Sequence, residues 1–199
     1  MATTELTGRW LRQVPNALTV LRLVLVPVFI VLLFWQPTLW QWRLAAAIAF
    51  TVAILTDFFD GRLARKYNLI SDFGKLWDPI ADKVLTGAAF VSLSILGELP
   101  WWVTIVILVR EWGVTWMRVA MLKYGVMAAQ AGGKLKTFLQ SVALILYLLK
   151  IGNAFMEWLG YLTMGAAFVL TVVTGLMCVR EAMVLRSQAT QPTKGDDDG

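Results

Sequence analysis

Long apolar runs constrain this chain more than any other feature of its sequence. Six of them approach the roughly 20 apolar residues that a helix needs to cross a hydrocarbon core of about 30 Å. Hydrophobic residues make up 58% of the chain and charged residues 16%, whereas soluble domains keep about a quarter of their residues charged. The pattern predicts an all-α integral membrane protein with six transmembrane helices. The expected spans are Leu18–Trp35, Trp42–Asp60, Asp78–Leu96, Trp101–Leu122, Leu135–Ile151 and Leu159–Val179.

Lys and Arg residues are distributed unequally between the two ends of these spans. Arg43 and Lys150 lie at one end, and most of the other basic residues lie at the opposite end. Because positively charged loops stay in the cytoplasm, both termini and the segment around Arg65 are expected to face it. Tryptophans near the less basic ends, such as Trp35 and Trp158, suit the aromatic belt of a membrane interface.

The segments outside the spans are polar. Residues 1–15 carry basic residues as a signal peptide would, but no small-residue cleavage site follows, so we expect an N-terminal juxtamembrane segment that stays attached. Residues 187–199 end in three Asp residues and are expected to form a flexible cytoplasmic tail. Residues 1–186 would then form a single six-helix domain.

The chain contains no His and a single Cys, Cys178. An intrachain disulfide is therefore impossible. The lack of His also removes the commonest transition-metal ligand and the commonest general base. Any metal or acid–base chemistry must depend on carboxylates.

Four Asp residues stand at the ends of two expected spans, where ionisable groups are costly and usually functional. Asp57 and Asp60 are three positions apart, and Asp78 and Asp82 are four apart, so each pair shares one face of a helix. Crowded carboxylates repel one another unless a cation lies between them, and oxygen ligands suit hard divalent ions. The set predicts a site for Mg²⁺ or Mn²⁺, with enough carboxylates for two ions.

Gly61 and Arg65 follow the first Asp pair. A Gly lets a bulky ligand approach the backbone, and an Arg four residues on suits a phosphate or nucleotide. Gly74 could serve helix entry or close packing equally well. Pro79 is tolerated in a first helical turn, which would place Asp78 near the N-terminus of its helix.

The whole segment resembles, at every fixed position, the signature of the CDP-alcohol phosphatidyltransferases, D-x2-D-G-x2-A-R-x8-G-x3-D-x3-D. The six expected spans are also similar to that family. The matching residues are Asp57, Asp60, Gly61, Ala64, Arg65, Gly74, Asp78 and Asp82.

The resemblance implies that an alcohol attacks the lipid-side phosphorus of a CDP-alcohol and releases CMP. By position, all four Asp residues would bind metal, and Asp82 would also be the general base. Gly61, Arg65 and Ser71 would contact the CDP group. The alternative, an internal salt-bridge network of these Asp residues with neighbouring Arg and Lys residues, would not need glycines at fixed offsets.

Basic residues inside the later spans bear on the acceptor alcohol. Arg110 and Arg118 are about two helical turns apart in the fourth span, and Lys134 and Lys136 open the fifth. Arg and Lys there suit a second phosphate, as in glycerol 3-phosphate. The alternatives are that Arg110 pairs with Glu111 or snorkels, and that the two Lys residues only follow the positive-inside rule.

Three short strings are similar to the bacterial phosphatidylglycerophosphate synthase branch of the family. They are Pro15–Thr19 with Arg22, Arg110–Glu111 with Arg118, and Gly133–Thr137. The branch implies CDP-diacylglycerol and glycerol 3-phosphate as substrates, phospholipid biosynthesis in the inner membrane, a homodimer and no nucleic-acid partner. Inositol phosphate or phosphatidylglycerol as acceptor, and a small cation transporter using the intramembrane Asp residues, are the alternative functions.

Overall fold

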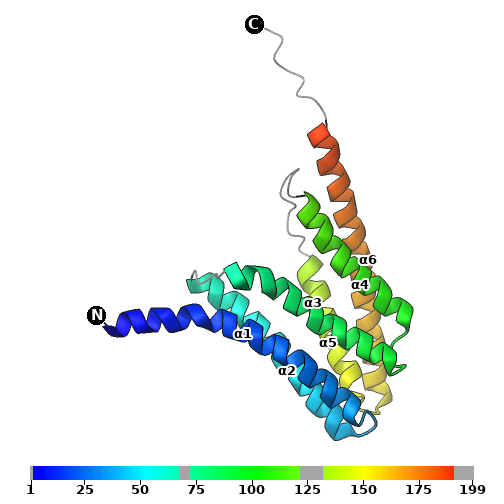
Figure 1. The fold of residues 1–199 in the computed structure, drawn as a ribbon. Helices are drawn as coiled ribbons and strands as arrows, with labels where there is room; N and C mark the ends of the chain where they lie inside the picture. The colour runs from blue at the N-terminus through cyan, green and yellow to red at the C-terminus, as the bar shows by residue number, and fades with distance from the viewer. Residues whose placement is uncertain (1, 68–71, 122–131, 191–199) are drawn as a thin grey trace.

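The computed structural model describes residues 2–67, 72–121 and 132–190, with side chains described for 19–56, 80–121 and 133–187. Over these ranges the chain forms six α-helices and no strands (Figure 1). The all-helical prediction is confirmed, and every expected span falls largely within one helix. The helices are α1 (Ala2–Trp35), α2 (Trp40–Tyr67), α3 (Asp72–Ile95), α4 (Trp101–Met121), α5 (Gly132–Leu149) and α6 (Ala154–Thr190).

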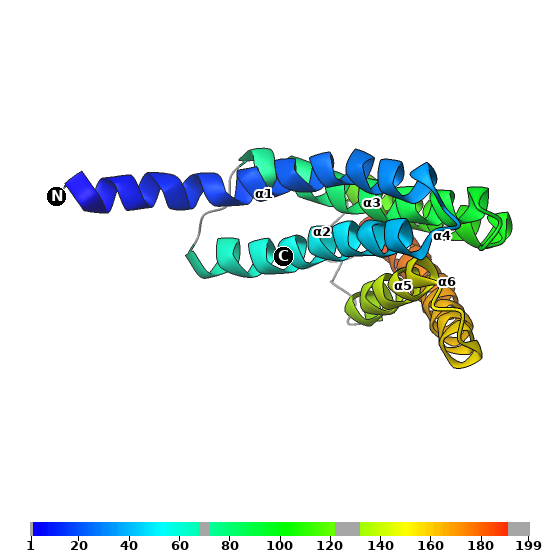
Figure 2. The ribbon, with the colours of Figure 1, turned by 90° about the horizontal axis from the view of Figure 1, so that it is seen from below.

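Helix α3 contacts four others, α1, α2, α4 and α5. Helix α2 packs on α1, α3 and α5, while α6 packs on α4 and α5. Figures 1 and 2 show α1 and α2 as a hairpin with α3 beside it, and the N-terminal part of α1 extending beyond its neighbours. In the described part of the chain α4 and α5 make no backbone contact with each other, and both lie against α3 and α6.

Small side chains explain why α2 can pack on three helices. Ala46, Ala49 and Ala53 recur at helical spacing and are all buried. Small residues let neighbouring backbones approach closely in a helical bundle. Next to them the rings of Phe29 and Phe50 pack with centroids 5.6 Å apart, and both side chains are fully buried.

Residues in the turns cap two helix ends, the C-terminus of α3 and the N-terminus of α6. Gly97 has a φ of 74°, and the backbone N–H of Glu98 donates to Leu93 O at 3.0 Å, the pattern of a helix C-terminus that a left-handed Gly completes. At the start of α6, Asn153 Oδ1 accepts from the N–H of Phe155 at 2.9 Å. That side chain satisfies one of the free donors of the first turn.

One ion-pair cluster joins three helix ends. Arg43, at the start of α2, donates to both carboxylate oxygens of Glu98 at 2.7 Å, and Lys150 donates to Oε1 of the same carboxylate at 2.8 Å. Arg43 also donates to the carbonyls of Leu148 at 3.0 Å and Tyr147 at 2.9 Å. These carbonyls belong to the last turn of α5, so the arginine caps that helix.

The surface is apolar over much of α4 and α6. Val109 is 67% exposed, and Leu162 and Leu176 are 71% and 66% exposed. Soluble monomers rarely expose large continuous apolar patches. By length and composition one described helix segment, Ala154–Ser187, could span a membrane, while Thr19–Trp35 and Trp40–Thr56 are apolar but shorter.

The helices around the Asp residues are longer than expected. Helix α2 continues to Tyr67 and α3 begins at Asp72, so the placement of Pro79 in a first turn was wrong. The missing N–H of Pro79 leaves the carbonyl of Lys75 without its usual helical donor, yet the helix runs through both positions. At the other terminus, α6 includes residues 187–190 of the expected tail.

Candidate functional site

The signature residues lie on the helical backbones of two neighbouring helices. Asp57, Asp60, Gly61 and Arg65 belong to α2, and Gly74, Asp78 and Asp82 belong to α3. Helices α2 and α3 are in contact. Of these residues, only Asp82 lies in a range where side chains are described, and Ser71 falls outside the described residues altogether.

The donor set fits a hard divalent cation by its chemistry. The two Asp pairs keep spacings of three and four residues on continuous helices, so each pair occupies one helix face. Carboxylate oxygens are the ligands that Mg²⁺ and Mn²⁺ prefer. Where side chains are described, no group of three or more Asp, Glu, His or Cys residues could hold a metal. The full set therefore remains a prediction.

Asp82 lies beside a group of charged residues from three helices. It is partly buried, and the hydroxyl of Thr86, one turn later, donates to its backbone carbonyl at 3.0 Å. Lys136 on α5 interacts electrostatically with Asp82, with Glu111 and with Arg110. A carboxylate expected to act as a base therefore interacts electrostatically with Lys136, one of the residues expected to bind an acceptor phosphate.

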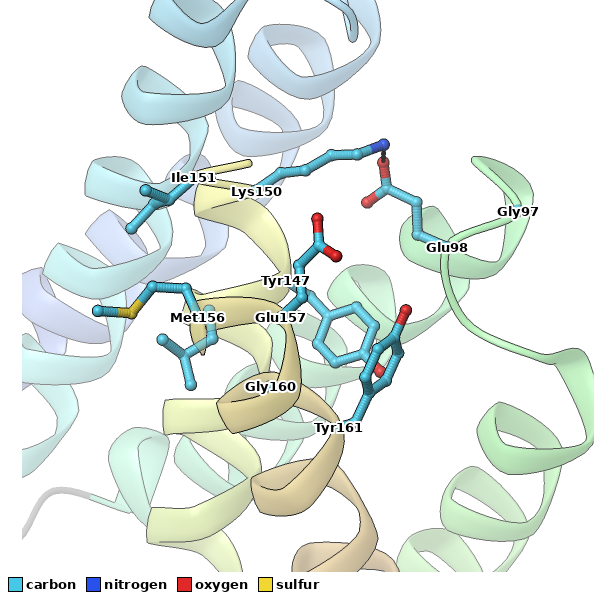
Figure 3. A pocket seen from close by; sticks show the side chains of 10 residues that line it. Gly97, Glu98, Tyr147, Lys150, Ile151, Met156, Glu157, Gly160 and Tyr161 are labelled. Atoms are coloured by element: carbon cyan, nitrogen blue, oxygen red, sulfur yellow. Dashed lines mark hydrogen bonds and ion pairs between the residues drawn. The ribbon is translucent and has the colours of Figure 1, made fainter. Parts of the chain in front are cut away.

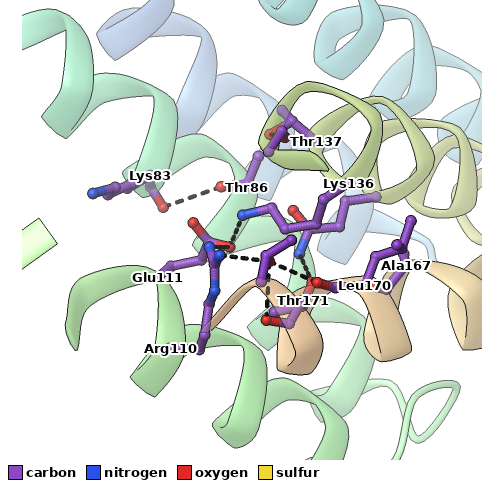
Figure 4. Close-up of polar contacts among 12 residues, drawn as sticks. Lys83, Thr86, Arg110, Glu111, Lys136, Thr137, Ala167, Leu170 and Thr171 are labelled. Carbon is purple, nitrogen blue, oxygen red and sulfur yellow. Dashed lines mark hydrogen bonds and ion pairs between the residues drawn. The ribbon is translucent and has the colours of Figure 1, made fainter. Parts of the chain in front are cut away.

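Glu111 connects those two basic residues (Figure 4). Its Oε1 accepts from Nη1 of Arg110 at 3.2 Å and from Nζ of Lys136. The ion pair of Arg110 with Glu111, considered as an alternative from the sequence, is thus present. Lys136 from another helix shares the same carboxylate. Lys136 is 4% exposed, so its position is not that of a cation that merely follows the positive-inside rule.

Polar side chains of α6 complete this cluster. Nη2 of Arg110 donates to Thr174 Oγ1 at 2.6 Å, and Nε2 of Gln140 donates to Thr171 Oγ1 at 3.0 Å. Sequence reasoning missed Gln140, Thr171 and Thr174 as partners. A pattern in the sequence could have indicated them. Polar residues three or four positions apart in an apolar helix need hydrogen-bond partners when they are buried.

Arg118 and Lys134 do not join the cluster directly. Both are exposed, and neither makes a hydrogen bond or ion pair with side chains in the described ranges. Arg118 does interact electrostatically with Lys83, whose Nζ lies 5.6 Å from the ring centroid of Trp112. The structure brings Arg110 and Lys136 together and leaves the other two expected residues at the surface.

A cavity of about 280 Å³ lies at the other end of the molecule (Figure 3). The turn after α3 and the ends of α5 and α6 line it, including Glu98, Tyr147, Lys150 and Tyr161. The rings of Tyr147 and Tyr161 meet edge to face, with centroids 6.0 Å apart. This cavity contains none of the residues expected for the site, and it adjoins the ion-pair cluster of Arg43.

Glu98 in that cluster has a shifted pKa. Burial raises the pKa of its carboxyl, but hydrogen bonds from Arg43 and Lys150 more than offset burial, and the pKa lies below its ordinary value of 4.5. The carboxylate is therefore held ionised by its neighbours. Its partners are the basic side chains of Arg43 and Lys150, and Arg43 also donates to helix carbonyls, so Glu98 serves as a structural joint rather than as an acid or base for catalysis.

Comparison with known proteins places the chain in a family. The sequence model of the CDP-alcohol phosphatidyltransferases matches residues 12–173. A protein of Mycobacterium tuberculosis strain H37Rv named probable phosphatidylglycerophosphate synthase is 46% identical over 183 residues, covering 91% of this chain and 87% of the relative.

Two further relatives share the name CDP-diacylglycerol–glycerol-3-phosphate 3-phosphatidyltransferase. The one from Rickettsia typhi is 38% identical and covers 83% of this chain and 94% of its own. The one from Bacillus subtilis is 39% identical, with 69% and 77% covered. The family match over residues 12–173 contains both Asp pairs together with Arg110, Glu111 and Lys136. The chain belongs to the CDP-alcohol phosphatidyltransferase family.

Proposed function

We propose that this enzyme transfers the phosphatidyl group of CDP-diacylglycerol to glycerol 3-phosphate, giving phosphatidylglycerophosphate and CMP. The observation that carries the choice of acceptor is the pairing of Arg110 and Lys136 on the carboxylate of Glu111, with Lys136 also interacting electrostatically with Asp82. A neutral alcohol would not need a buried Lys and a partly buried Arg there. The names of the relatives point to the same acceptor.

The Asp residues of α2 and α3 would hold the diphosphate end of the nucleotide lipid. Asp57, Asp60, Asp78 and Asp82 would bind two ions of Mg²⁺ or Mn²⁺, which when bound neutralise phosphate oxygens and the leaving group. Divalent-metal dependence is general in this family. Gly61, Arg65 and Ser71 would contact the CDP group.

Asp82 would act as the general base. Its carboxylate takes the proton of the C1 hydroxyl of glycerol 3-phosphate, and the oxygen forms a bond to the lipid-side phosphorus. The bond from that phosphorus to the oxygen of CMP breaks, and CMP leaves with that oxygen. With no His in the sequence, a carboxylate is the expected base.

Arg110 and Lys136 would bind the phosphate of the acceptor. Arg can donate two parallel hydrogen bonds to a phosphate, and Lys supplies a compact charge. Glu111 occupies both cations in the structure, so the acceptor phosphate would replace its carboxylate as their partner. Exposed Arg118 and Lys134 would attract the anionic acceptor toward this place.

The setting would be the inner membrane, with six spans and with the termini and the Asp site facing the cytoplasm, where soluble acceptors are found. The exposed apolar side chains of α4 and α6 and exposed Trp side chains near helix ends support this placement. We include in the proposal a single catalytic domain over 1–186 and a homodimer, which light scattering in detergent would test.

An acceptor panel tests the proposed function. The purified enzyme with CDP-diacylglycerol and Mg²⁺ should release CMP with glycerol 3-phosphate, and should not do so with inositol phosphate, phosphatidylglycerol or no acceptor. An EDTA-treated sample serves as the control for metal dependence. Release with another acceptor, and none with glycerol 3-phosphate, would refute the choice of acceptor. Cation flux without CMP release would indicate a transporter.

A further inference from the structure

Helix α6 provides a space into which Arg110 fits. A Cβ atom built on Gly175 would lie 3.0 Å from Cγ and 3.3 Å from Nε of Arg110, closer than carbon and nitrogen atoms normally pack. A side chain at position 175 would therefore require the arginine to shift by a few tenths of an ångström. On the same helix, a Cβ at Gly165 would have no atom within 4 Å, and one at Gly160 would lie 3.5 Å from a ring carbon of Tyr147, so Gly175 has the tightest approach of the three.

Thr174 fixes the end of the same arginine. Its hydroxyl lies 2.6 Å from the carbonyl of Leu170 and 2.6 Å from Nη2 of Arg110. A hydroxyl has one proton, which goes to the carbonyl, because the guanidinium has no acceptor atom. Thr174 therefore receives a hydrogen bond from Arg110 with a lone pair whose direction its helix sets.

The two sides of the guanidinium are held by groups of different charge. Glu111 holds Nη1 with a carboxylate that also contacts Lys136, and Thr174 holds Nη2 with a neutral hydroxyl. An incoming phosphate competes with the carboxylate, since both are anions. The phosphate does not compete in this way with the neutral hydroxyl of Thr174. Arg110 therefore stays bound to Thr174 while its anionic partner changes.

The position of Arg110 leaves one of its hydrogen-bond donors unsatisfied, which lowers the stability of the fold. Nε is buried and has no hydrogen-bond partner among the described residues, and an unsatisfied buried donor is unfavourable. A residue that only joined two helices would be expected to use all its donors, as Arg43 does with Glu98 and the end of α5.

We infer that Thr174 and Gly175 are positioning residues, which hold the Arg110 guanidinium in the orientation that binds the phosphate of the acceptor. The inference rests on the proposed function, because it takes an anionic acceptor for granted. It adds two residues of α6 that lie after the matched family region, which ends at residue 173.

The test compares KM for glycerol 3-phosphate with KM for CDP-diacylglycerol. Replacing Thr174 by Val keeps the shape and removes the hydroxyl, and should raise KM for glycerol 3-phosphate about tenfold, the effect of one hydrogen bond to a charged group. The kcat and the KM for CDP-diacylglycerol should stay within about twofold, because the lost contact orients a residue proposed to bind the acceptor and not one proposed to bind CDP-diacylglycerol. Thr174→Ser should restore the wild-type KM.

Matched controls come from the same helix. Within the described ranges Thr163 donates only to carbonyls of its own helix, so Thr163→Val should leave both KM values unchanged. Gly175→Ala should act like Thr174→Val, whereas Gly165→Ala should not. If Thr174→Val fails to fold, the pair of glycine variants decides the question.

The outcomes separate the two proposals. A wild-type enzyme that does not use glycerol 3-phosphate would overturn the proposed function itself. A wild-type enzyme that uses it, with Thr174→Val and Gly175→Ala unchanged in KM or altered equally for both substrates, would overturn only the positioning role.

Discussion

The hydrogen-bond donors of the buried Arg43 and the partly buried Arg110 are satisfied to different degrees. Arg43 uses Nε, Nη1 and Nη2 on a carboxylate and on helix carbonyls. Arg110 contacts Glu111 and Thr174, and its buried Nε has no partner among the described residues. Since folding alone favours complete satisfaction, the difference supports a structural role for Arg43 and a binding role for Arg110.

Asp82 is the residue whose chemistry can be tested most simply. Asp82→Asn keeps the size of the side chain and removes its ability to accept a proton at neutral pH. We expect kcat to fall by about 10²- to 10⁴-fold, the usual contribution of a general base, with CMP release as the measurement. Thermal unfolding should be nearly unchanged. Wild-type turnover in this variant would exclude Asp82 as the base.

At the scale of helices, the apolar runs were sufficient to predict six elements. They did not predict how far α2 and α3 continue, because charged residues such as Asp60 and Arg65 end an apolar run without ending a helix. Nor did they show that Glu111 joins two helices, since Lys136 is distant in sequence. The contacts that Thr171, Thr174 and Gln140 make with other helices could be predicted only after it was known which helices are neighbours.

The joint of Arg43, Glu98 and Lys150 gives a prediction for helix packing. Glu98→Gln leaves the buried charge of Arg43 without a carboxylate, and should lower the free energy of unfolding by about 3 kcal/mol, as for other broken buried pairs. Thermal unfolding in detergent measures it. Glu157→Gln is the control, since this carboxylate is exposed at the same end and makes no ion pair with side chains in the described ranges.

The ion pair of Arg43 with Glu98 also predicts that the free energy of unfolding depends on pH. The pKa of Glu98 is lowered by folding, so its contribution to stability is present above the ordinary value of 4.5 and is lost as the pH falls through the lower folded pKa. The stability difference between wild type and Glu98→Gln should therefore shrink below about pH 4.5. A difference that stayed constant down to pH 3 would contradict the ionised role of Glu98.

At the scale of the whole molecule, two polar regions lie at opposite ends of an apolar bundle. The turns that follow α1, α3 and α5 gather at one end with the joint of Arg43, as Figure 1 shows. The C-terminal end of α2 and the N-terminal end of α3 lie away from that end. This separation suits the proposal that the Asp residues face one compartment.

Labelling of single cysteines tests the orientation. Cys178 is buried and would be replaced by Ala, after which a Cys is placed at Thr38 or at Ser187, both of which are exposed. In intact cells a membrane-impermeant maleimide should label position 38 and not 187. Labelling of both positions after the membrane is opened is the control. The reverse pattern would invert the proposed topology.

The fate of the acceptor oxygen tests the central claim most directly. Glycerol 3-phosphate carrying ¹⁸O in its C1 hydroxyl would be incubated with CDP-diacylglycerol, Mg²⁺ and the enzyme in vesicles, and the products analysed by mass spectrometry. The account predicts phosphatidylglycerophosphate with ¹⁸O in its new phosphodiester and an equal amount of unlabelled CMP. CMP released without a labelled lipid would contradict it.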